Sequence, residues 1–94
     1  MTAKACRLVI RGRVQGVGYR DSAVQAAFVN AVAGWVRNRS DGTVEAFVQG
    51  APEAVERYVE WCRRGPPLAR VAAVEVVAAT PDATLRHFAW RATK

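Results

Sequence analysis

The sequence contains few of the side chains on which most catalytic and metal sites depend. Its single histidine, His87, stands beside Phe88 near the C-terminus without a matched serine or carboxylate partner, so nucleophilic catalysis of the serine–histidine type has no support. The two cysteines, Cys6 and Cys62, have neither CxxC spacing nor neighbouring histidines. This pattern argues against a zinc site and against a disulfide framework. We therefore expect two reduced, buried thiols and a protein that uses no metal and no cofactor.

Long hydrophobic segments and runs of like charge are also missing. No apolar run approaches the roughly 20 residues that span a bilayer, and the N-terminus lacks the apolar core of a signal peptide. Both absences favour a cytoplasmic protein that does not engage a membrane. The net charge of +6 comes from twelve arginines and two lysines, which are scattered along the chain. Such scattering is more typical of a solvated basic surface than of a nucleic-acid interface, so we expect no nucleic-acid partner.

Length and composition define the class of protein. Apolar residues make up 51% of the 94 residues and charged residues 23%, as in folded globular proteins. The chain is too short for a second hydrophobic core. We expect one domain over residues 1–94, acting as a monomer.

Alternating hydrophobicity identifies several strands. In the first of them most apolar side chains share one face, and Arg7, Arg11 and Arg13 point to the other with Val9 among them, as in a half-buried strand with a basic outer surface. Asp41-Gly42 lies between two strand-like runs and predicts a hairpin. The expected strands cover residues 5–14, 35–38, 43–49, 71–79 and 88–90.

Two further segments have helical periodicity. Over residues 19–32, the large apolar side chains Val24, Phe28 and Val32 recur at intervals of four, which predicts an amphipathic helix that ends near Gly34. A proline suits the first turn of a second helix, and a Gly-Pro-Pro run stops it. The resulting order is β-α-β-β-α-β with a short extra C-terminal strand. This order predicts an α+β fold of the ferredoxin-like kind, with two helices on one face of an antiparallel sheet.

The connection between the first strand and the first helix, Val14 to Arg20, holds two glycines and an arginine. A tight glycine turn that opens a helix presents several backbone N–H groups in one direction, and such a turn binds phosphate well. The Arg20 guanidinium is placed to clamp the same phosphate oxygens. A cation in the first turn opposes the helix dipole, and such a local conflict is typical of a functional position.

Three linked motifs then give the chain a resemblance to a known family. The turn reads VQGVGYR, and it is followed by GWVRN and by DGTVE. In this order and at this separation the motifs resemble the signature of the acylphosphatases, and the later GPPLARV run resembles a further segment of that family. The resemblance covers about residues 5–78.

The resemblance implies hydrolysis of the carboxyl–phosphate bond of a small acyl phosphate, which gives a carboxylate and inorganic phosphate. In the family, the backbone amides of the turn and its arginine hold the phosphoryl group, and the asparagine orients the attacking water. By motif position, Arg20 and Asn38 become the catalytic residues. The expected phosphate-binding residues are Gln15, Gly16, Val17, Gly18, Tyr19 and Arg20.

These roles agree with what phosphoryl transfer requires, because positioning and charge stabilisation supply most of the catalysis. Two alternatives stay open: a basic RNA-binding module of the same topology, and a regulatory module without catalysis. Gln15 and Thr43 are also explicable as ordinary turn residues. Arg37 and Arg39 have two roles of equal weight, an electropositive site mouth or a solvated strand face.

Overall fold

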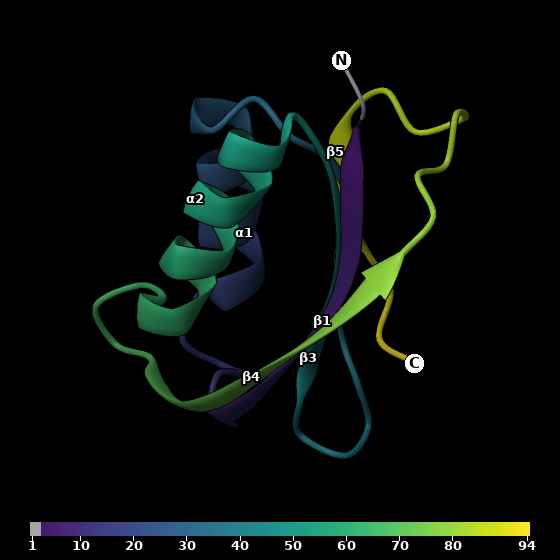
Figure 1. Ribbon diagram of the computed structural model, residues 1–94. Coiled ribbons are helices and arrows are strands. Elements are labelled where there is room, and N and C mark those ends of the chain that lie inside the picture. The colour runs from purple at the N-terminus through teal and green to yellow at the C-terminus, as the bar shows by residue number, and fades with distance from the viewer. Residues whose placement is uncertain (1–2) are drawn as a thin grey trace.

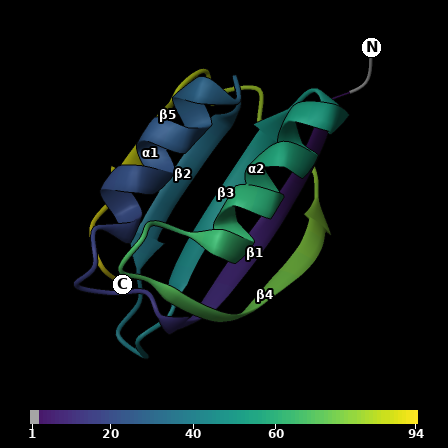
Figure 2. The same ribbon diagram turned by 90° about the vertical axis from the view of Figure 1, so that its left-hand side faces the viewer.

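The computed structural model describes residues 3–94 and arranges them in two layers, with both helices packed on one face of a five-stranded sheet (Figure 1). Figure 2 looks onto the helix layer and shows the two helices lying side by side over the sheet. This arrangement confirms the predicted ferredoxin-like α+β fold. The elements are β1 (Lys4–Arg13), α1 (Tyr19–Val29), β2 (Ala33–Asn38), β3 (Val44–Gly50), α2 (Pro52–Arg64), β4 (Arg70–Ala79) and β5 (Phe88–Arg91).

The sheet has the strand order β4-β1-β3-β2-β5. The first four strands pair antiparallel, as predicted: β1 with β3 and β4, and β2 with β3. The short C-terminal strand β5 is added differently, because it runs parallel to β2. As a result, the last strand lies beside the strand that ends in Asn38.

The hydrophobic core fills the space between the sheet and the helices. Leu8 and Ile10 of β1 are fully buried there, whereas Arg7 on the same strand is exposed, so the predicted alternation is confirmed. Cys6 and Cys62 are both buried and free, as expected. Among residues 3–94 no helix combines the length and the apolar character needed to cross a membrane.

The first helix is shorter than predicted. It ends at Val29, and the backbone N–H of Asn30 caps it by donating to the carbonyl of Ala26 at 3.0 Å. Ala31 then adopts a left-handed conformation, with φ of 57°, which turns the chain out of the helix. Gly34 therefore does not end the helix but lies within β2. There a side chain at position 34 would collide with the neighbouring strand, because an added Cβ would lie 1.8 Å from the carbonyl oxygen of Phe47.

The buried face of α1 also differs from the prediction. Phe28, expected in the core, is 87% exposed, and Val24 is only half-buried. The face that meets the sheet and α2 is built instead from Tyr19 and small residues, among them Ala23 and Ala27, which are 0% exposed. Small side chains let the helix approach its neighbours closely, and the large apolar residues at the rim remain outside.

Candidate active site

The turn between β1 and α1 has the backbone geometry of an anion site. Gly16 and Gly18 have φ of 73° and 79°, whereas Val17 between them has no positive φ. Alternation of left- and right-handed residues aims successive N–H groups into one concavity. Gly18 is also the N-cap of α1, and no side chain caps the helix there. An added Cβ on either glycine would meet nothing within 4 Å, so the space above the turn is open to a ligand.

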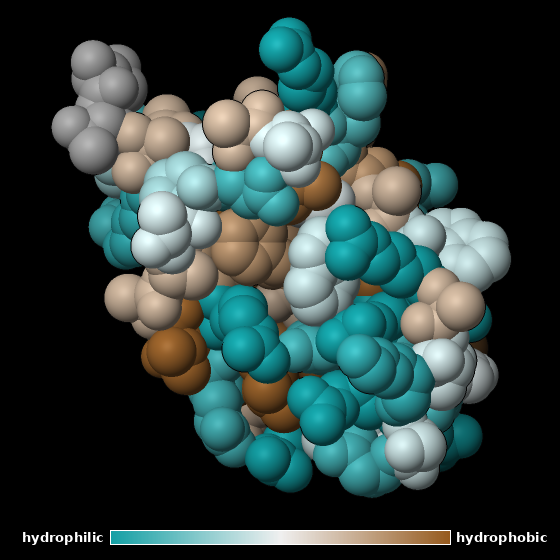
Figure 3. Space-filling view, turned by 90° about the vertical axis from the view of Figure 1, so that its right-hand side faces the viewer, coloured by the Kyte–Doolittle hydropathy of each residue, from teal (hydrophilic) through white to brown (hydrophobic). Residues whose placement is uncertain are grey.

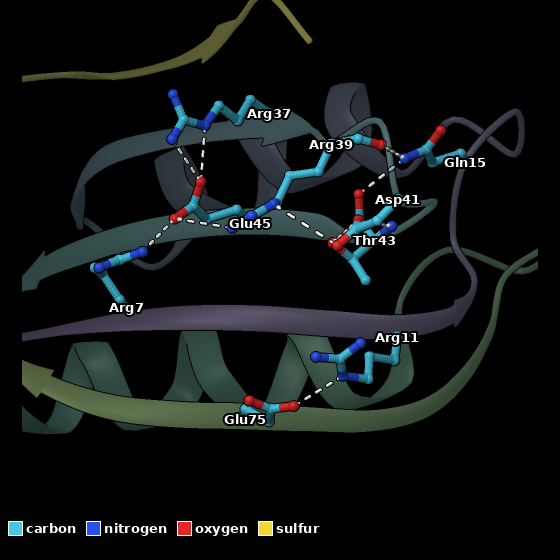
Figure 4. Close-up of polar contacts among 9 residues, drawn as sticks. All are labelled: Arg7, Arg11, Gln15, Arg37, Arg39, Asp41, Thr43, Glu45 and Glu75. Atoms are coloured by element: carbon cyan, nitrogen blue, oxygen red, sulfur yellow. Dashed lines mark hydrogen bonds and ion pairs between the residues drawn. The ribbon is translucent and has the colours of Figure 1, made fainter. Parts of the chain in front are cut away.

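Gln15 fixes this turn to the rest of the fold. Its Nε2 donates to the carbonyl oxygens of Arg39 at 2.7 Å and Thr43 at 2.8 Å, which lie in and after the β2–β3 connection (Figure 4). The Gln15 side-chain donor is thus occupied by protein, so the predicted phosphate-binding role of Gln15 would rest on its backbone N–H. Thr43 is held in turn by Asp41, whose Oδ1 accepts a hydrogen bond from the Thr43 hydroxyl at 2.6 Å.

Tyr19 anchors the start of α1 in the core. Its side chain is 2% exposed, and its hydroxyl donates to the carbonyl of Cys62 on α2 at 2.8 Å. Burial raises the pKa of Tyr19, so the phenol stays neutral. The Tyr19 hydroxyl is thus bonded within the core, so a phosphate-binding role at this position would rest on the backbone N–H.

Arg20 follows in the first turn of the helix and is half-buried. Within residues 3–94 it forms no ion pair, unlike Arg7 and Arg37, which bind Glu45. Its guanidinium carbon lies 5.1 Å from the centre of the Trp90 ring of β5. The N–H donors of Arg20 are therefore not committed to a protein carboxylate.

Asn38 is the last residue of β2 and is half-buried. Its backbone carbonyl accepts a hydrogen bond from the N–H of Lys94 at 3.1 Å, and the carbonyl of Lys94 accepts one from Ser40 at 3.0 Å, so the end of the strand is braced. In the described part of the chain its carboxamide makes no hydrogen bond to protein, which leaves that group available to a water molecule.

A cavity of about 230 Å³ brings these elements together. Gly16, Gly18, Tyr19, Arg20 and Asn38 line it, together with Val14 and Asp21. Gln15 and Val17, the other predicted phosphate-binding residues, do not line it, although both belong to the same turn. The cavity thus joins a nest of backbone donors, a free guanidinium and a free carboxamide, which suits a small, doubly charged oxyanion with an adjacent water. No cluster of three metal-ligating side chains occurs among residues 3–94.

The sequence matches the family model Acylphosphatase over residues 6–90. The chain belongs to the acylphosphatase family. The acylphosphatase of Bordetella parapertussis (strain 12822) is 46% identical over 82 residues, which is 87% of each chain. That of Azoarcus sp. (strain BH72) is 54% identical over 80 residues, or 85% of this chain and 82% of the other. The crystal structure of the acylphosphatase from Bacillus subtilis has a TM-score of 0.89 at 33% identity, over 94% of this chain and 98% of that one.

Membership of the acylphosphatase family makes the protein an enzyme, a hydrolase with acylphosphatase function, and confirms the resemblance carried by the three motifs.

Figure 3 shows the face of this acylphosphatase fold that the helices leave uncovered, where hydrophilic side chains surround less polar ones. Arginines of this outer face converge on one buried carboxylate, that of Glu45. Glu45 is 1% exposed and accepts hydrogen bonds from Arg7 at 2.6 Å and Arg37 at 2.8 Å (Figure 4).

Arg37 and Arg39 therefore belong to this outer face. Successive side chains of a strand alternate, so Arg37 lies on the face opposite to Asn38. Burial raises the pKa of Glu45, but the hydrogen bonds from Arg7 and Arg37 outweigh it and lower that pKa overall. Arg39 adds a longer contact of 3.8 Å to the same carboxylate. These pairings favour the strand-face role for Arg37 and Arg39 over a role at the mouth of the site.

The aromatic side chains of the outer face are covered. Phe47 is 9% exposed and stacks on Trp35, with 6.3 Å between ring centres. The guanidinium carbons of Arg37 and Arg91 each lie 4.8 Å from the Trp35 ring centre. Single-stranded RNA is bound on exposed aromatic rings that bases stack against. The coverage of both rings speaks against the RNA-binding alternative.

Two features of the acylphosphatase site region were not found from the sequence. Local sequence patterns indicate no role for Trp90, since its neighbours depend on the parallel pairing of β5 with β2. The burial of Glu45 is likewise not indicated by the sequence, because an alternating strand usually places its charged residue in solvent. The sequence does hold one indication of a buried carboxylate: β1 and β2, the strands on either side of Glu45, both carry arginines that a carboxylate between them could pair with.

Proposed function

We propose that the cavity beside the glycine turn is the catalytic site at which acyl phosphates are hydrolysed. The backbone N–H groups of residues 15–20 and the Arg20 guanidinium hold the phosphoryl group, and Asn38 orients the attacking water. The observation that carries this proposal is that Arg20 and Asn38, from separate elements, line one cavity with two left-handed glycines.

The reaction needs little covalent help from the protein. The water held by the Asn38 carboxamide attacks phosphorus in line, forming a P–O bond while the bond between phosphorus and the acyl oxygen breaks. The carboxylate leaves with the electron pair, and because it is stable as an anion it needs no general acid. The proton of the water passes to a phosphate oxygen. Charge on the equatorial oxygens is stabilised by Arg20 and the N–H nest, which are already in place before the reaction.

Replacement of Arg20 or Asn38 tests the proposal directly. Arg20→Ala and Asn38→Ala are expected to abolish measurable phosphate release from benzoyl phosphate, since removal of even one preorganised donor costs about 10²- to 10³-fold in kcat. Both variants should keep the wild-type circular dichroism spectrum, because neither side chain is part of the core. Arg57→Ala is the matched control, for it removes an exposed arginine of α2 outside the cavity. A folded Arg20 or Asn38 variant with full activity would refute the mechanism.

Further properties belong to the same proposal. We expect a single-domain, cytoplasmic monomer that requires no metal or cofactor and binds no nucleic acid. The free, buried thiols of Cys6 and Cys62 support a reducing compartment. Activity unchanged by EDTA, a monomeric mass in solution, and no retention of RNA at moderate salt are the expected results. Retention of RNA without turnover of benzoyl phosphate would instead favour the RNA-binding module.

A further inference from the structure

We propose that Trp90 is the positioning residue for Arg20: its ring holds the guanidinium beside the glycine turn in the orientation that receives phosphate. This inference rests on the proposed role of Arg20 in phosphate binding. It assigns a function to the C-terminal strand, which lies outside the three motifs that carry the family resemblance.

The topology places Trp90 at the site. β5 runs parallel to β2, and Trp90 is in register with Val36, which is fully buried beneath the helices. Phe88, two residues earlier on β5, packs against Tyr58 of α2 with 5.4 Å between ring centres. Because side chains two apart on a strand share a face, Trp90 lies on this same helix-covered side. From there its ring reaches the first turn of α1 and meets Arg20, with 5.1 Å from guanidinium carbon to ring centre.

The chemistry of the contact suits a phosphate clamp. An aromatic ring attracts the flat face of a guanidinium through its quadrupole, whereas phosphate oxygens bind the N–H groups at the guanidinium edge. The two interactions therefore use different parts of Arg20 and do not compete. A carboxylate in the place of Trp90 would also restrain Arg20, but it would occupy the N–H donors and repel an anionic substrate.

Exposure supports a role other than core packing. Trp90 is 56% exposed, so much of its ring area is not used to bury apolar surface. Within residues 3–94 Arg20 has no ion-pair partner, so its contact with the Trp90 ring can restrain the long, flexible side chain without competing with a carboxylate. Restraint before binding lowers the entropy lost when phosphate is clamped.

The experiment compares Trp90→Leu and Trp90→Phe with the wild type, using inorganic phosphate as the probe of binding and benzoyl phosphate as the substrate. An exposed cation–π contact corresponds to about two- to fivefold in affinity. Trp90→Leu should weaken phosphate binding by that factor and lower kcat/KM at least as much, and Trp90→Phe should restore most of both. Trp35→Leu is the matched control, since it removes a ring that contacts arginines on the other face of the sheet. It should leave phosphate binding unchanged.

A double-mutant cycle with Arg20→Ala separates positioning from a general structural effect. If Trp90 acts through Arg20, Trp90→Leu will not weaken phosphate binding further once Arg20 is gone. An equal loss in both backgrounds would overturn the inference, as would unchanged or tighter phosphate binding in Trp90→Leu alone. If Arg20→Ala itself leaves phosphate affinity unchanged, the proposed function fails at its first step. An unchanged phosphate affinity in Arg20→Ala would thus count against the proposed function, whereas an unchanged affinity in Trp90→Leu alone would count against the Trp90 inference.

Discussion

The Gln15 carboxamide nitrogen lies 2.8 Å from the carbonyl oxygen of Thr43, and this hydrogen bond fastens the glycine turn to the β2–β3 connection. The turn carries the N–H groups that we propose bind phosphate, and the strand before the connection ends in Asn38. A second hydrogen bond from Gln15, to Arg39, closes the same gap. The spacing between the glycine turn and the end of β2, where Asn38 lies, is therefore set in part by the Gln15 side chain.

Replacement of Gln15 by leucine should separate the two halves of the site. The Arg39 and Thr43 carbonyls each lose a donor, which costs about 1–3 kcal/mol of unfolding free energy. We expect kcat for benzoyl phosphate to fall at least tenfold, because small displacements of reacting groups are expensive. Urea unfolding and steady-state kinetics measure the two effects. Gln25→Leu is the control, since Gln25 is exposed on α1, and it should change neither quantity appreciably. A stable, fully active Gln15 variant would contradict this coupling.

Gly18→Ala and Gly42→Ala form a matched pair. Both glycines have a left-handed φ, 79° and 91°, and at both an added Cβ meets nothing within 4 Å. Alanine should therefore cost each about 1–2 kcal/mol of stability through backbone strain alone. Only Gly18→Ala is expected to weaken inorganic phosphate binding, because Gly18 lines the cavity and Gly42 does not. Equal phosphate affinity in the two variants would show that the turn does not bind the ligand.

Glu45 should govern part of the acid stability of the protein. Its pKa in the folded state is lowered from the ordinary value of 4.5, so its ion pairs stabilise the fold fully above that pH. The stabilisation is lost as the pH falls from there through the lower, folded-state pKa. Glu45→Gln should cost about 2 kcal/mol at neutral pH, since Arg7 and Arg37 lose a buried partner. Its unfolding free energy should then change less than that of the wild type below pH 4.5. If chemical denaturation showed the unfolding free energies of Glu45→Gln and the wild type falling by the same amount below pH 4.5, this prediction would be contradicted.

Phe28 and Ala27 offer a test of which face of α1 is buried. Phe28→Ser changes a side chain that is 87% exposed and should alter stability by less than about 0.5 kcal/mol. Ala27→Leu places extra volume where the native side chain is 0% exposed and should cost about 1–3 kcal/mol. Thermal unfolding of both variants decides the matter. A larger loss of stability in Phe28→Ser than in Ala27→Leu would instead support burial of the face of α1 predicted from the sequence.

The contrast on α1 shows where sequence patterns suffice and where they do not. Alternation in β1 predicted its buried face correctly, because a strand on a one-sided core has only two faces to choose between. On α1 the four-residue repeat of large apolar residues and the repeat of alanines lie on adjacent faces, and the close approach of α2 favoured the alanines. The motifs pointed to the turn, Arg20 and Asn38, which the structure brings to one cavity. The neighbours of Arg20 and Glu45 depended on strand pairing across the sheet, which a local pattern does not encode.

β2 acts as a partition within the molecule. Val36 and Asn38 belong to its helix-covered side, and Trp35 and Arg37 to the arginine-rich side, so the proposed catalytic carboxamide and the surface charge come from interleaved residues of one strand. Charge on the outer face can therefore be redesigned by point substitution without entering the cavity. Insertion or deletion of a single residue within β2 is a different matter, because it exchanges the two sides and replaces the carboxamide at the cavity with a guanidinium. Substitution on the outer side of β2 should therefore leave the cavity intact, whereas a change of length should remove Asn38 from it.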